Sequence, residues 1–167
     1  KEAIQQGYVT SEPHTIETRG GFKPQVFLLS DYGYPSYAAM VLARTDWIEN
    51  RSEHVQAFVN ATIEGWQSYV YGDPAPGSRL ILAANPDMTP EIIEQAIEQM
   101  RRRAMLLSPD TEAHGIGTMT RERWRQFFDT MSAHGVYDPT LDWQQAFTTQ
   151  FVKQTQASDP VKPPANR

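Results

Sequence analysis

The chain has no cysteine, no long apolar run and no excess of basic residues, and each absence excludes a class of protein. Without cysteine, the chain cannot form disulfides, thiolate metal sites or a cysteine nucleophile. No apolar run approaches the roughly 20 residues that a membrane-spanning helix needs. A general nucleic-acid binder needs a basic surface, and the formal charge of -5 at pH 7 argues against that class.

Familiar catalytic and metal-binding motifs are also missing. The sequence has no Gly-x-Ser-x-Gly elbow, no phosphate-binding glycine-rich loop and no His-Glu-x-x-His pair. The histidines show no ligand-like spacing to one another or to a nearby pair of acids; they are His14, His54, His114 and His134. We therefore predict neither a metal site nor a cofactor, and we do not expect an enzyme.

What the sequence does contain indicates a folded protein. The 167 residues are about the size of one domain, and 40% of them are hydrophobic. This composition is far from that of a disordered chain. The chain begins with Lys1 and not with Met, so we expect a processed or trimmed N-terminus.

Residues 5–13 predict a short strand that leads directly into a helix. Residues 8–10 are aromatic and β-branched, which suits a strand. Ser11 can cap a helix that has Glu12 and Pro13 in its first turn. In open α/β sheets such a junction is where ligands bind. Because it comes so early, we expect either an edge strand or a chain that is part of a larger fold.

Two further segments predict short buried strands, and a turn-rich aromatic segment, residues 30–37, separates them. The predicted strands are residues 26–29 and 40–43, which are short apolar runs. Three strands under several helices would make a lopsided sheet. We therefore expect further strands from sequence outside this chain.

Apolar residues at helical spacing predict a helix-rich remainder. One helix is expected from Ser52 until Gly72-Asp73-Pro74, with Gly65 marking close packing. Others are expected to begin at Thr89 and Thr120, and a last one to cover residues 141–152. Gly135 suits a left-handed C-cap. Residues 153–167 contain few apolar groups and are expected to be a tail.

Four blocks of sequence together resemble one family. These blocks, residues 7–13, 23–34, 41–48 and 55–66, are similar in order and spacing to the thiamine-pyrimidine, nitrate, sulfonate and taurine group of ABC-transporter solute-binding proteins. The likeness runs from Ile4 to Val152 and covers the C-terminal half of such a protein.

The resemblance implies the α/β class, as part of a two-lobed periplasmic-binding-protein fold whose N-terminal half is absent from the chain. On this basis residues 1–39 would end the second lobe and include the crossover segment. Residues 40–152 would form the helical C-terminal part of the first lobe, and residues 153–167 the tail.

The resemblance also implies a function. Such proteins hold a small molecule in the cleft between the lobes and deliver it to the membrane permease of an ABC importer. The expected location is periplasmic, or extracellular and membrane-anchored in a Gram-positive source. The predicted ligand-binding residues are Tyr8, Ser11, Glu12, Asp31, Tyr32 and Tyr34. A carboxylate at Glu12 would oppose an anion, which favours an aminopyrimidine or a similar planar heterocycle over nitrate, a sulfonate or taurine.

Each of these residues also has a structural explanation. Ser11 and Glu12 can stabilise their own helix, and Asp31 can serve the turn that follows it. The tyrosines of residues 32–37 can pack at a hinge instead of stacking on a ligand. The four tryptophans lie at core spacing on predicted helices; they are Trp47, Trp66, Trp124 and Trp143. Arginines at 101–103 and at 121, 123 and 125 suit a solvated helix face.

Two other functions stay open. One is an enzyme similar to a thiamine-pyrimidine synthase, although the cysteine-rich motif of that enzyme has no counterpart here. The other is a helical protein-interaction module, in which the apolar stripes of residues 52–72 and 89–105 meet a protein partner. The predicted strands count against the module.

Overall fold

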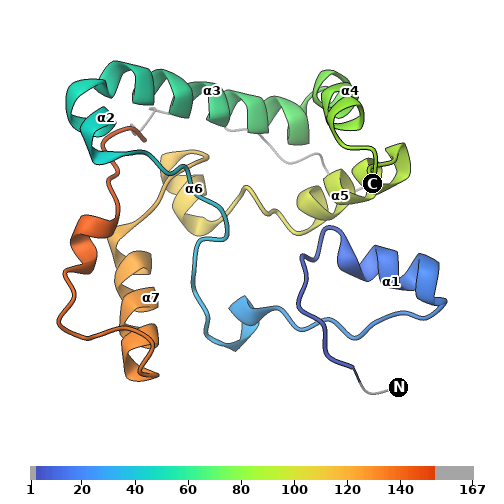
Figure 1. Ribbon diagram of the computed structural model, residues 1–167, viewed down its shortest axis with the longest axis horizontal. Helices are drawn as coiled ribbons and strands as arrows, with labels where there is room; N and C mark the ends of the chain where they lie inside the picture. The colour runs from blue at the N-terminus through green and yellow to red at the C-terminus, as the bar shows by residue number, and fades with distance from the viewer. Residues whose placement is uncertain (1–2, 153–167) are drawn as a thin grey trace. The chain divides into compact units, whose positions relative to one another are not determined.

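The computed structural model describes residues 3–152, and all regular secondary structure in that range is helical (Figure 1). The α-helices are α1 (Glu12–Gly20), α2 (Thr45–Asn50), α3 (Ser52–Tyr71), α4 (Ala75–Ala84), α5 (Pro90–Arg102), α6 (Pro109–His114) and α7 (Arg121–Ala133). Two short 3-10 helices are η1 (Leu29–Tyr32) and η2 (Trp143–Ala146). None of the described helices is both long enough and apolar enough to cross a membrane.

The chain divides into two compact units, and the division falls within α3. The first unit comprises the residues up to 27 and residues 66–106, and the second comprises residues 28–65 and the chain from 107 onward. The predicted division of the chain at residues 39 and 152 stays a prediction. The predicted tail, residues 153–167, lies outside the described residues.

In the first unit a small apolar core forms around the end of α3. Val70, Ile93 and Ile97 are buried, and the last two lie one turn apart on α5. The Arg101 guanidinium donates its Nε hydrogen bond to the Val70 carbonyl oxygen. The core is therefore closed by a charged group from the last turn of α5.

Helix α4 contacts α5 and also approaches the end of α3 closely. A Cβ atom added at Gly77 would lie 2.8 Å from the Tyr69 ring. Any larger residue at this position would require the Tyr69 ring or its helix to shift. Glycine at position 77 thus permits the contact.

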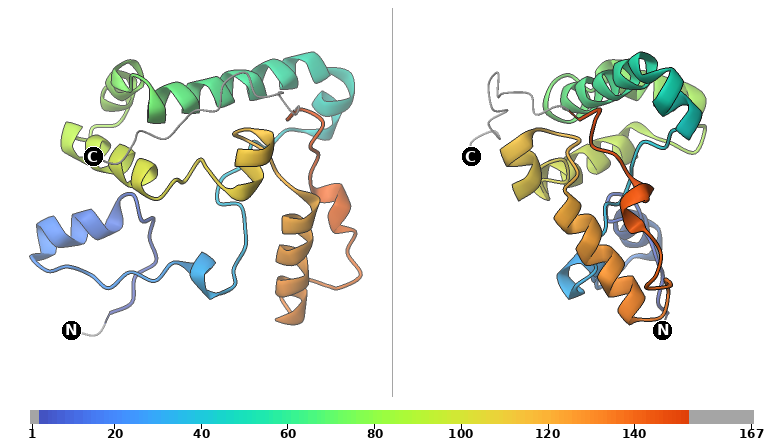
Figure 2. Two further views of the ribbon diagram at one scale, coloured as in Figure 1. Left: turned by 180° about the vertical axis from the view of Figure 1, so that it is seen from behind. Right: turned by 90° about the vertical axis from the view of Figure 1, so that its left-hand side faces the viewer.

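In the second unit the start of α3 holds the end of the described chain. Val55 and Phe151 are buried, and the Gln56 side-chain amide donates a 2.7 Å hydrogen bond to the Phe151 carbonyl oxygen. An aromatic stack joins α7 to η2, which lies beside it in Figures 1 and 2. Phe147 is nearly parallel to Trp124, at 4.7 Å between ring centroids, and to Trp143, at 6.2 Å.

Four predicted helices, α1, α3, α5 and α7, are confirmed, and for the last three the residues that begin or end them are confirmed as well. Helix α3 covers the predicted residues 52–71. The Thr89 hydroxyl accepts a hydrogen bond from the Ile92 N–H, and the Thr120 hydroxyl accepts one from the Arg123 N–H. Gly135 follows α7 with φ of 70°, as a left-handed cap requires.

The predicted strands are wrong for the described residues, and the α/β class is not confirmed there. Residues 8–10 lead into a turn, and residues 26–28 and 40–44 form no strand. Leu29 begins η1. The expected burial is also absent, since Leu42 is 97% exposed. A strand needs a neighbour with which to exchange backbone hydrogen bonds, and apolar β-prone residues alone do not supply it.

The last predicted helix, residues 141–152, is wrong as well. Only η2 forms, capped by the Asp142 side chain, which accepts a hydrogen bond from the Gln144 N–H. Phe147 ends it with extended backbone angles, φ of -147° and ψ of 161°. This extension keeps Phe147 beside Trp124, so tertiary stacking overrides the helical pattern.

Two inferences about packing are also wrong. A Cβ at Gly65 would meet nothing within 4 Å, so this glycine marks no close contact. Trp47 and Trp66 are 41% and 45% exposed, so they do not form a core.

Helices α2, α4 and α6 were not predicted. Gly72-Asp73-Pro74 does end α3, but the Asp73 carboxylate accepts a hydrogen bond from the Ala75 N–H and begins α4.

Candidate functional site

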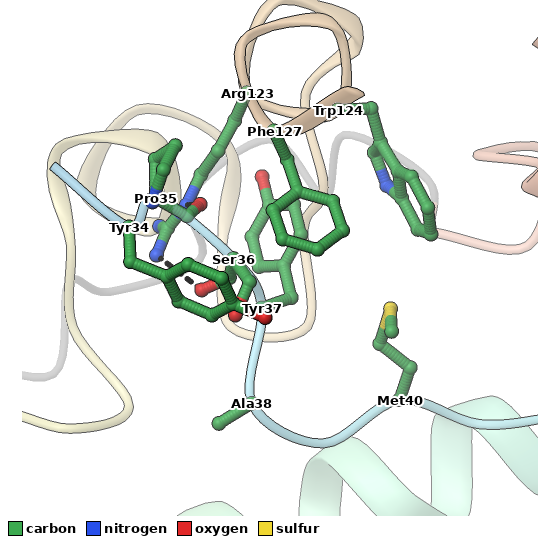
Figure 3. Close-up of a pocket in the computed structure, with 9 residues that line it drawn as sticks. All are labelled: Tyr34, Pro35, Ser36, Tyr37, Ala38, Met40, Arg123, Trp124 and Phe127. Atoms are coloured by element: carbon green, nitrogen blue, oxygen red, sulfur yellow. Dashed lines mark hydrogen bonds between the residues drawn. The ribbon is translucent and has the colours of Figure 1, made fainter. Parts of the chain in front are cut away.

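A cavity of about 260 Å³ lies in the second unit, between the segment after η1 and one face of α7 (Figure 3). Its lining residues are Tyr34, Pro35, Ser36, Tyr37, Ala38, Met40, Arg123, Trp124 and Phe127. The two walls come from parts of the chain more than 80 residues apart. The cavity is therefore a product of tertiary structure.

Aromatic rings form much of this cavity. The Tyr34 and Phe127 rings meet edge to face, with centroids 5.3 Å apart. The Tyr37 and Trp124 rings are 6.3 Å apart and tilted by 43°. Aromatic faces of this kind stack on planar ligands and do not depend on ligand charge.

Arg123 holds the segment after η1 against α7. Its Nε donates a 2.9 Å hydrogen bond to the Pro35 carbonyl oxygen, and its Nη2 donates a 3.1 Å hydrogen bond to the Ser36 carbonyl oxygen. The guanidinium carbon also lies 4.3 Å from the centroid of the Tyr37 ring, in a cation–π contact. The prediction that Arg123 belongs to a solvated face is wrong, because its guanidinium binds the Pro35 and Ser36 carbonyl oxygens and the Tyr37 ring.

Asp110 on α6 completes this arrangement. Its Oδ2 accepts a 3.2 Å hydrogen bond from the Tyr37 hydroxyl and lies 4.0 Å from Arg123 Nη1. The Tyr37 hydroxyl in turn accepts a 2.8 Å hydrogen bond from the Thr120 N–H. The negative charge of Asp110 offsets the positive charge of Arg123. The site therefore presents little net charge to a ligand.

One shielded polar atom of the lining has no partner. The Trp124 indole Nε1–H is shielded from solvent and meets no acceptor among the described residues. Buried indole N–H groups usually have a hydrogen-bond partner. Trp124 combines this free donor with a ring held by the Phe147 stack.

The predicted ligand-binding residues belong to different units. Tyr34 lines the cavity, and Asp31 and Tyr32 lie in η1, exposed and outside the lining. Tyr8, Ser11 and Glu12 belong to the first unit. Their joint role at one site stays a prediction.

Glu12 forms a local arrangement at the start of α1. Its Oε2 accepts 2.6 Å hydrogen bonds from the Ser11 hydroxyl and from the Tyr8 N–H. The Ser11 bond is the main cause of the lowered pKa of Glu12; the Tyr8 bond also lowers the pKa, whereas partial burial opposes the shift. The predicted Ser11 side-chain cap is wrong, because this hydroxyl caps no backbone N–H of α1.

Sequence reasoning missed Arg123, Trp124 and Phe127 as site residues. The two aromatic residues fit a helical core stripe, and nothing in the sequence pairs them with residues 34–40. An arginine directly before an aromatic residue of the same helix, Arg123 before Trp124, was the available signal. The described residues contain no group of three His, Asp or Glu side chains placed to hold a metal ion.

Comparison with known proteins identifies one family. The family model described as NMT1/THI5 like matches residues 2–75, which is less than half of the chain. That part of the chain, called the NMT1/THI5-like segment below, is similar to this family, and the predicted resemblance is confirmed there. For residues 76–152 the resemblance stays a prediction. A search of curated proteins and a search of solved structures returned no match.

The family match supports a solute-binding or thiamine-pyrimidine-related role. Domains of this family are generally binding proteins, although some members are enzyme-like. They are typically extracellular or periplasmic. The match ends at residue 75, so it includes the wall of the cavity formed by residues 34–40 and excludes the wall formed by α7.

Proposed function

We propose that this protein is the periplasmic solute-binding component of an ABC importer and that it binds a planar heterocycle, with a pyrimidine as the favoured ligand. The observation that carries the proposal is the aromatic cavity, one wall of which lies within the NMT1/THI5-like segment. Its proposed partner is the membrane permease of the importer.

The chemistry of the cavity supports a neutral planar ligand over an inorganic anion. Arg123, the cationic side chain among the described residues of the lining, already donates to two carbonyl oxygens and faces Asp110. An anion would have to compete with these contacts. A flat ring needs only the faces of Tyr34, Tyr37 and Phe127, which suits an aminopyrimidine better than nitrate or taurine.

Binding without reaction is the better supported alternative. Three titratable groups in and beside the cavity, Tyr37, Asp110 and Arg123, are paired with one another, and Tyr34 is a further titratable group of the lining. A nucleophile or general base needs a free position toward the substrate. The enzyme-like alternative would become the better one if a bound pyrimidine were converted.

The proposal includes the α/β periplasmic-binding fold, with strands contributed by the N-terminal half of the same protein. Residues 26–28 and 40–44 have the composition of strands and would pair with that half. The proposed ligand contacts from the first unit are Tyr8, Ser11 and Glu12, and those from η1 are Asp31 and Tyr32. Tyr34 is the predicted residue that also lines the cavity.

Calorimetric titration of the purified protein with 4-amino-2-methylpyrimidine, nitrate and taurine tests the proposal. We expect saturable binding of the pyrimidine, and Tyr34→Ala is expected to weaken it by about tenfold because a stacking face is lost. Phe58→Ala is the matched control, since Phe58 is 62% exposed on α3 and lies outside the cavity. Binding of taurine or nitrate without binding of the pyrimidine would overturn the ligand class.

A further inference from the structure

We propose that a second cavity, at the start of α7, binds the carboxylate group of a small organic acid. This cavity has a volume of about 270 Å³ and is lined by Met119, Arg121, Gln144, Phe147, Thr148 and Thr149. It shares no lining residue with the aromatic cavity. The proposed carboxylate site is therefore additional to the proposed pyrimidine site and does not depend on it.

The polar side chains of the second cavity offer hydrogen-bond donors and no carboxylate. Arg121 contributes a guanidinium, Gln144 an amide, and Thr148 and Thr149 a hydroxyl each. No Asp or Glu lines the cavity. Arg121, Gln144 and Thr149 are exposed, so a dissolved ligand can reach their donors. This combination of accessible donors and one positive charge favours a ligand with a negatively charged oxygen group.

The charge of Arg121 is paired with no acid among residues 3–152. Its Nη1 donates a hydrogen bond to the Oε1 atom of Gln144, which is a neutral amide. Arg123, two positions later on α7, instead faces the carboxylate of Asp110. The two arginines therefore differ in function: Arg123 holds its own cavity together, and Arg121 keeps its charge for a ligand.

The acids closest to the second cavity in sequence do not use its donors. Glu122 accepts a 3.1 Å hydrogen bond from the Gln126 side chain. Asp142 accepts hydrogen bonds from the Gln144 backbone N–H, at 3.2 Å, and from the Gln145 side chain, at 2.9 Å. Both acids lie outside the lining.

The contact between Arg121 and Gln144 leaves one edge of the guanidinium available. Because Nη1 is the atom that binds Gln144, the Nε and Nη2 groups keep their hydrogens for another partner. A carboxylate binds such an edge through two parallel hydrogen bonds. The Gln144 contact also restrains the arginine before the ligand arrives, which reduces the entropy lost on binding.

Charge and shape favour a carboxylate over a phosphate. One carboxylate balances the single positive charge of Arg121, whereas a phosphate dianion would leave a negative charge in a protein whose formal charge is already -5. Met119 and Phe147 add apolar surface to the lining. This surface suits the hydrocarbon part of a small organic acid.

A pair of matched ligands tests the proposal on the unmodified protein. Butyrate and butyramide have nearly the same shape, and only butyrate carries a charge. In an NMR titration at constant physiological ionic strength, we expect butyrate to shift the Gln144 side-chain amide and the Thr149 backbone amide saturably. Butyramide should bind about tenfold more weakly, because it cannot accept two charge-assisted hydrogen bonds.

Two variants with the same change in net charge separate a site from a general charge effect. Arg121→Gln should weaken butyrate binding about tenfold, because the guanidinium edge is lost. Arg125→Gln is the matched control, since Arg125 lies on the same helix, outside the cavity, and its Nε is 3.5 Å from the Asp129 carboxylate. We expect this variant to keep the affinity of the unmodified protein.

Three results would overturn the proposal. The first is equal affinity of the unmodified protein for butyrate and butyramide, or no binding of either. The second is equal weakening by both variants, which would assign the binding to overall charge. The third is tighter binding of inorganic phosphate than of butyrate, which would contradict the carboxylate class. None of these results bears on pyrimidine binding in the aromatic cavity, so the two proposals fail independently.

Discussion

At the scale of single residues, Glu12 shows how a short-range contact sets an electrostatic property. The chain that enters α1 supplies two hydrogen bonds to this carboxylate, from the Ser11 hydroxyl and the Tyr8 N–H. Both favour the ionised form and lower its pKa. A carboxylate with a lowered pKa stabilises the fold above the usual glutamate pKa, and this contribution is lost as pH falls through the lowered value.

We predict that Ser11→Ala raises the pKa of Glu12 toward the usual glutamate value, because the largest cause of the shift is removed. An NMR titration of the side-chain carboxyl carbon measures it. Ser78→Ala, on α4, serves as the control and should leave the Glu12 titration unchanged. An unaltered Glu12 pKa in the Ser11 variant would show that the hydroxyl does not bond to the carboxylate in solution.

Tyr37 offers a second test at this scale. Tyr37→Phe removes the acceptor for the Thr120 N–H and the donor to Asp110, and it keeps the ring beneath Arg123. We expect the free energy of unfolding to fall by about 1 kcal/mol, measured by urea denaturation. Tyr8→Phe is the control, since the Tyr8 side chain is 73% exposed. Equal losses in the two variants would contradict the role given to Tyr37.

Single residues were predictable from sequence where the physics is local. Thr89 and Thr120 cap their helices as expected, because a cap involves only residues up to three positions away. The role of Arg123 was not predictable, because its acceptors lie more than 80 positions earlier in the chain. Phe127, whose ring meets that of Tyr34 in the cavity, was missed for the same reason.

At the scale of elements, two glycines have opposite roles. Gly65 lies inside α3 with open space where a Cβ would stand, whereas Gly135 follows α7 with φ of 70°. Alanine suits a helix interior better than glycine, and a positive φ is costly for any residue with a Cβ atom.

We therefore predict that Gly65→Ala stabilises the protein by about 0.5–1 kcal/mol and that Gly135→Ala destabilises it by about 1 kcal/mol. Urea denaturation of both variants beside the unmodified protein measures the two changes with opposite sign. A destabilising Gly65→Ala would indicate that α3 meets a neighbour at this position. That result would support the close packing at Gly65 that the sequence predicts.

The long helices could be predicted from the periodicity of their apolar residues, whereas the short elements could not. Helix α3 has enough turns for its apolar stripe to be recognised. Helix α2 has six residues, and the helical pattern of residues 141–152 gave way to the stacking of Phe147 on Trp124 and Trp143. A sequence pattern contains no information about which distant ring will compete for a side chain.

At the scale of the whole molecule, the apolar segment before α2 is unusual. Residues 40–44 are β-prone, and they donate no backbone hydrogen bond within the described residues. Exposed apolar segments of this kind are a template for pairing with another strand. The proposed fold supplies such a strand from the N-terminal half of the protein.

We predict that amides of residues 40–44 exchange with solvent more than about a hundredfold faster in the 167-residue chain than in a protein that also contains the proposed N-terminal half. Hydrogen–deuterium exchange measures both, with amides in the middle of α3 as the protected internal reference. Equal exchange of residues 40–44 in the two proteins would contradict the proposed strand pairing.

The two walls of the cavity also set a rule for protein engineering. A chimera that receives only the NMT1/THI5-like segment would inherit Tyr34 and Tyr37 without α7. It would carry one wall of the cavity, and the carbonyl oxygens of Pro35 and Ser36 would lose the Arg123 guanidinium that donates hydrogen bonds to them. A biosensor built from this protein should therefore contain both α7 and residues 34–40, transferred together into the recipient protein.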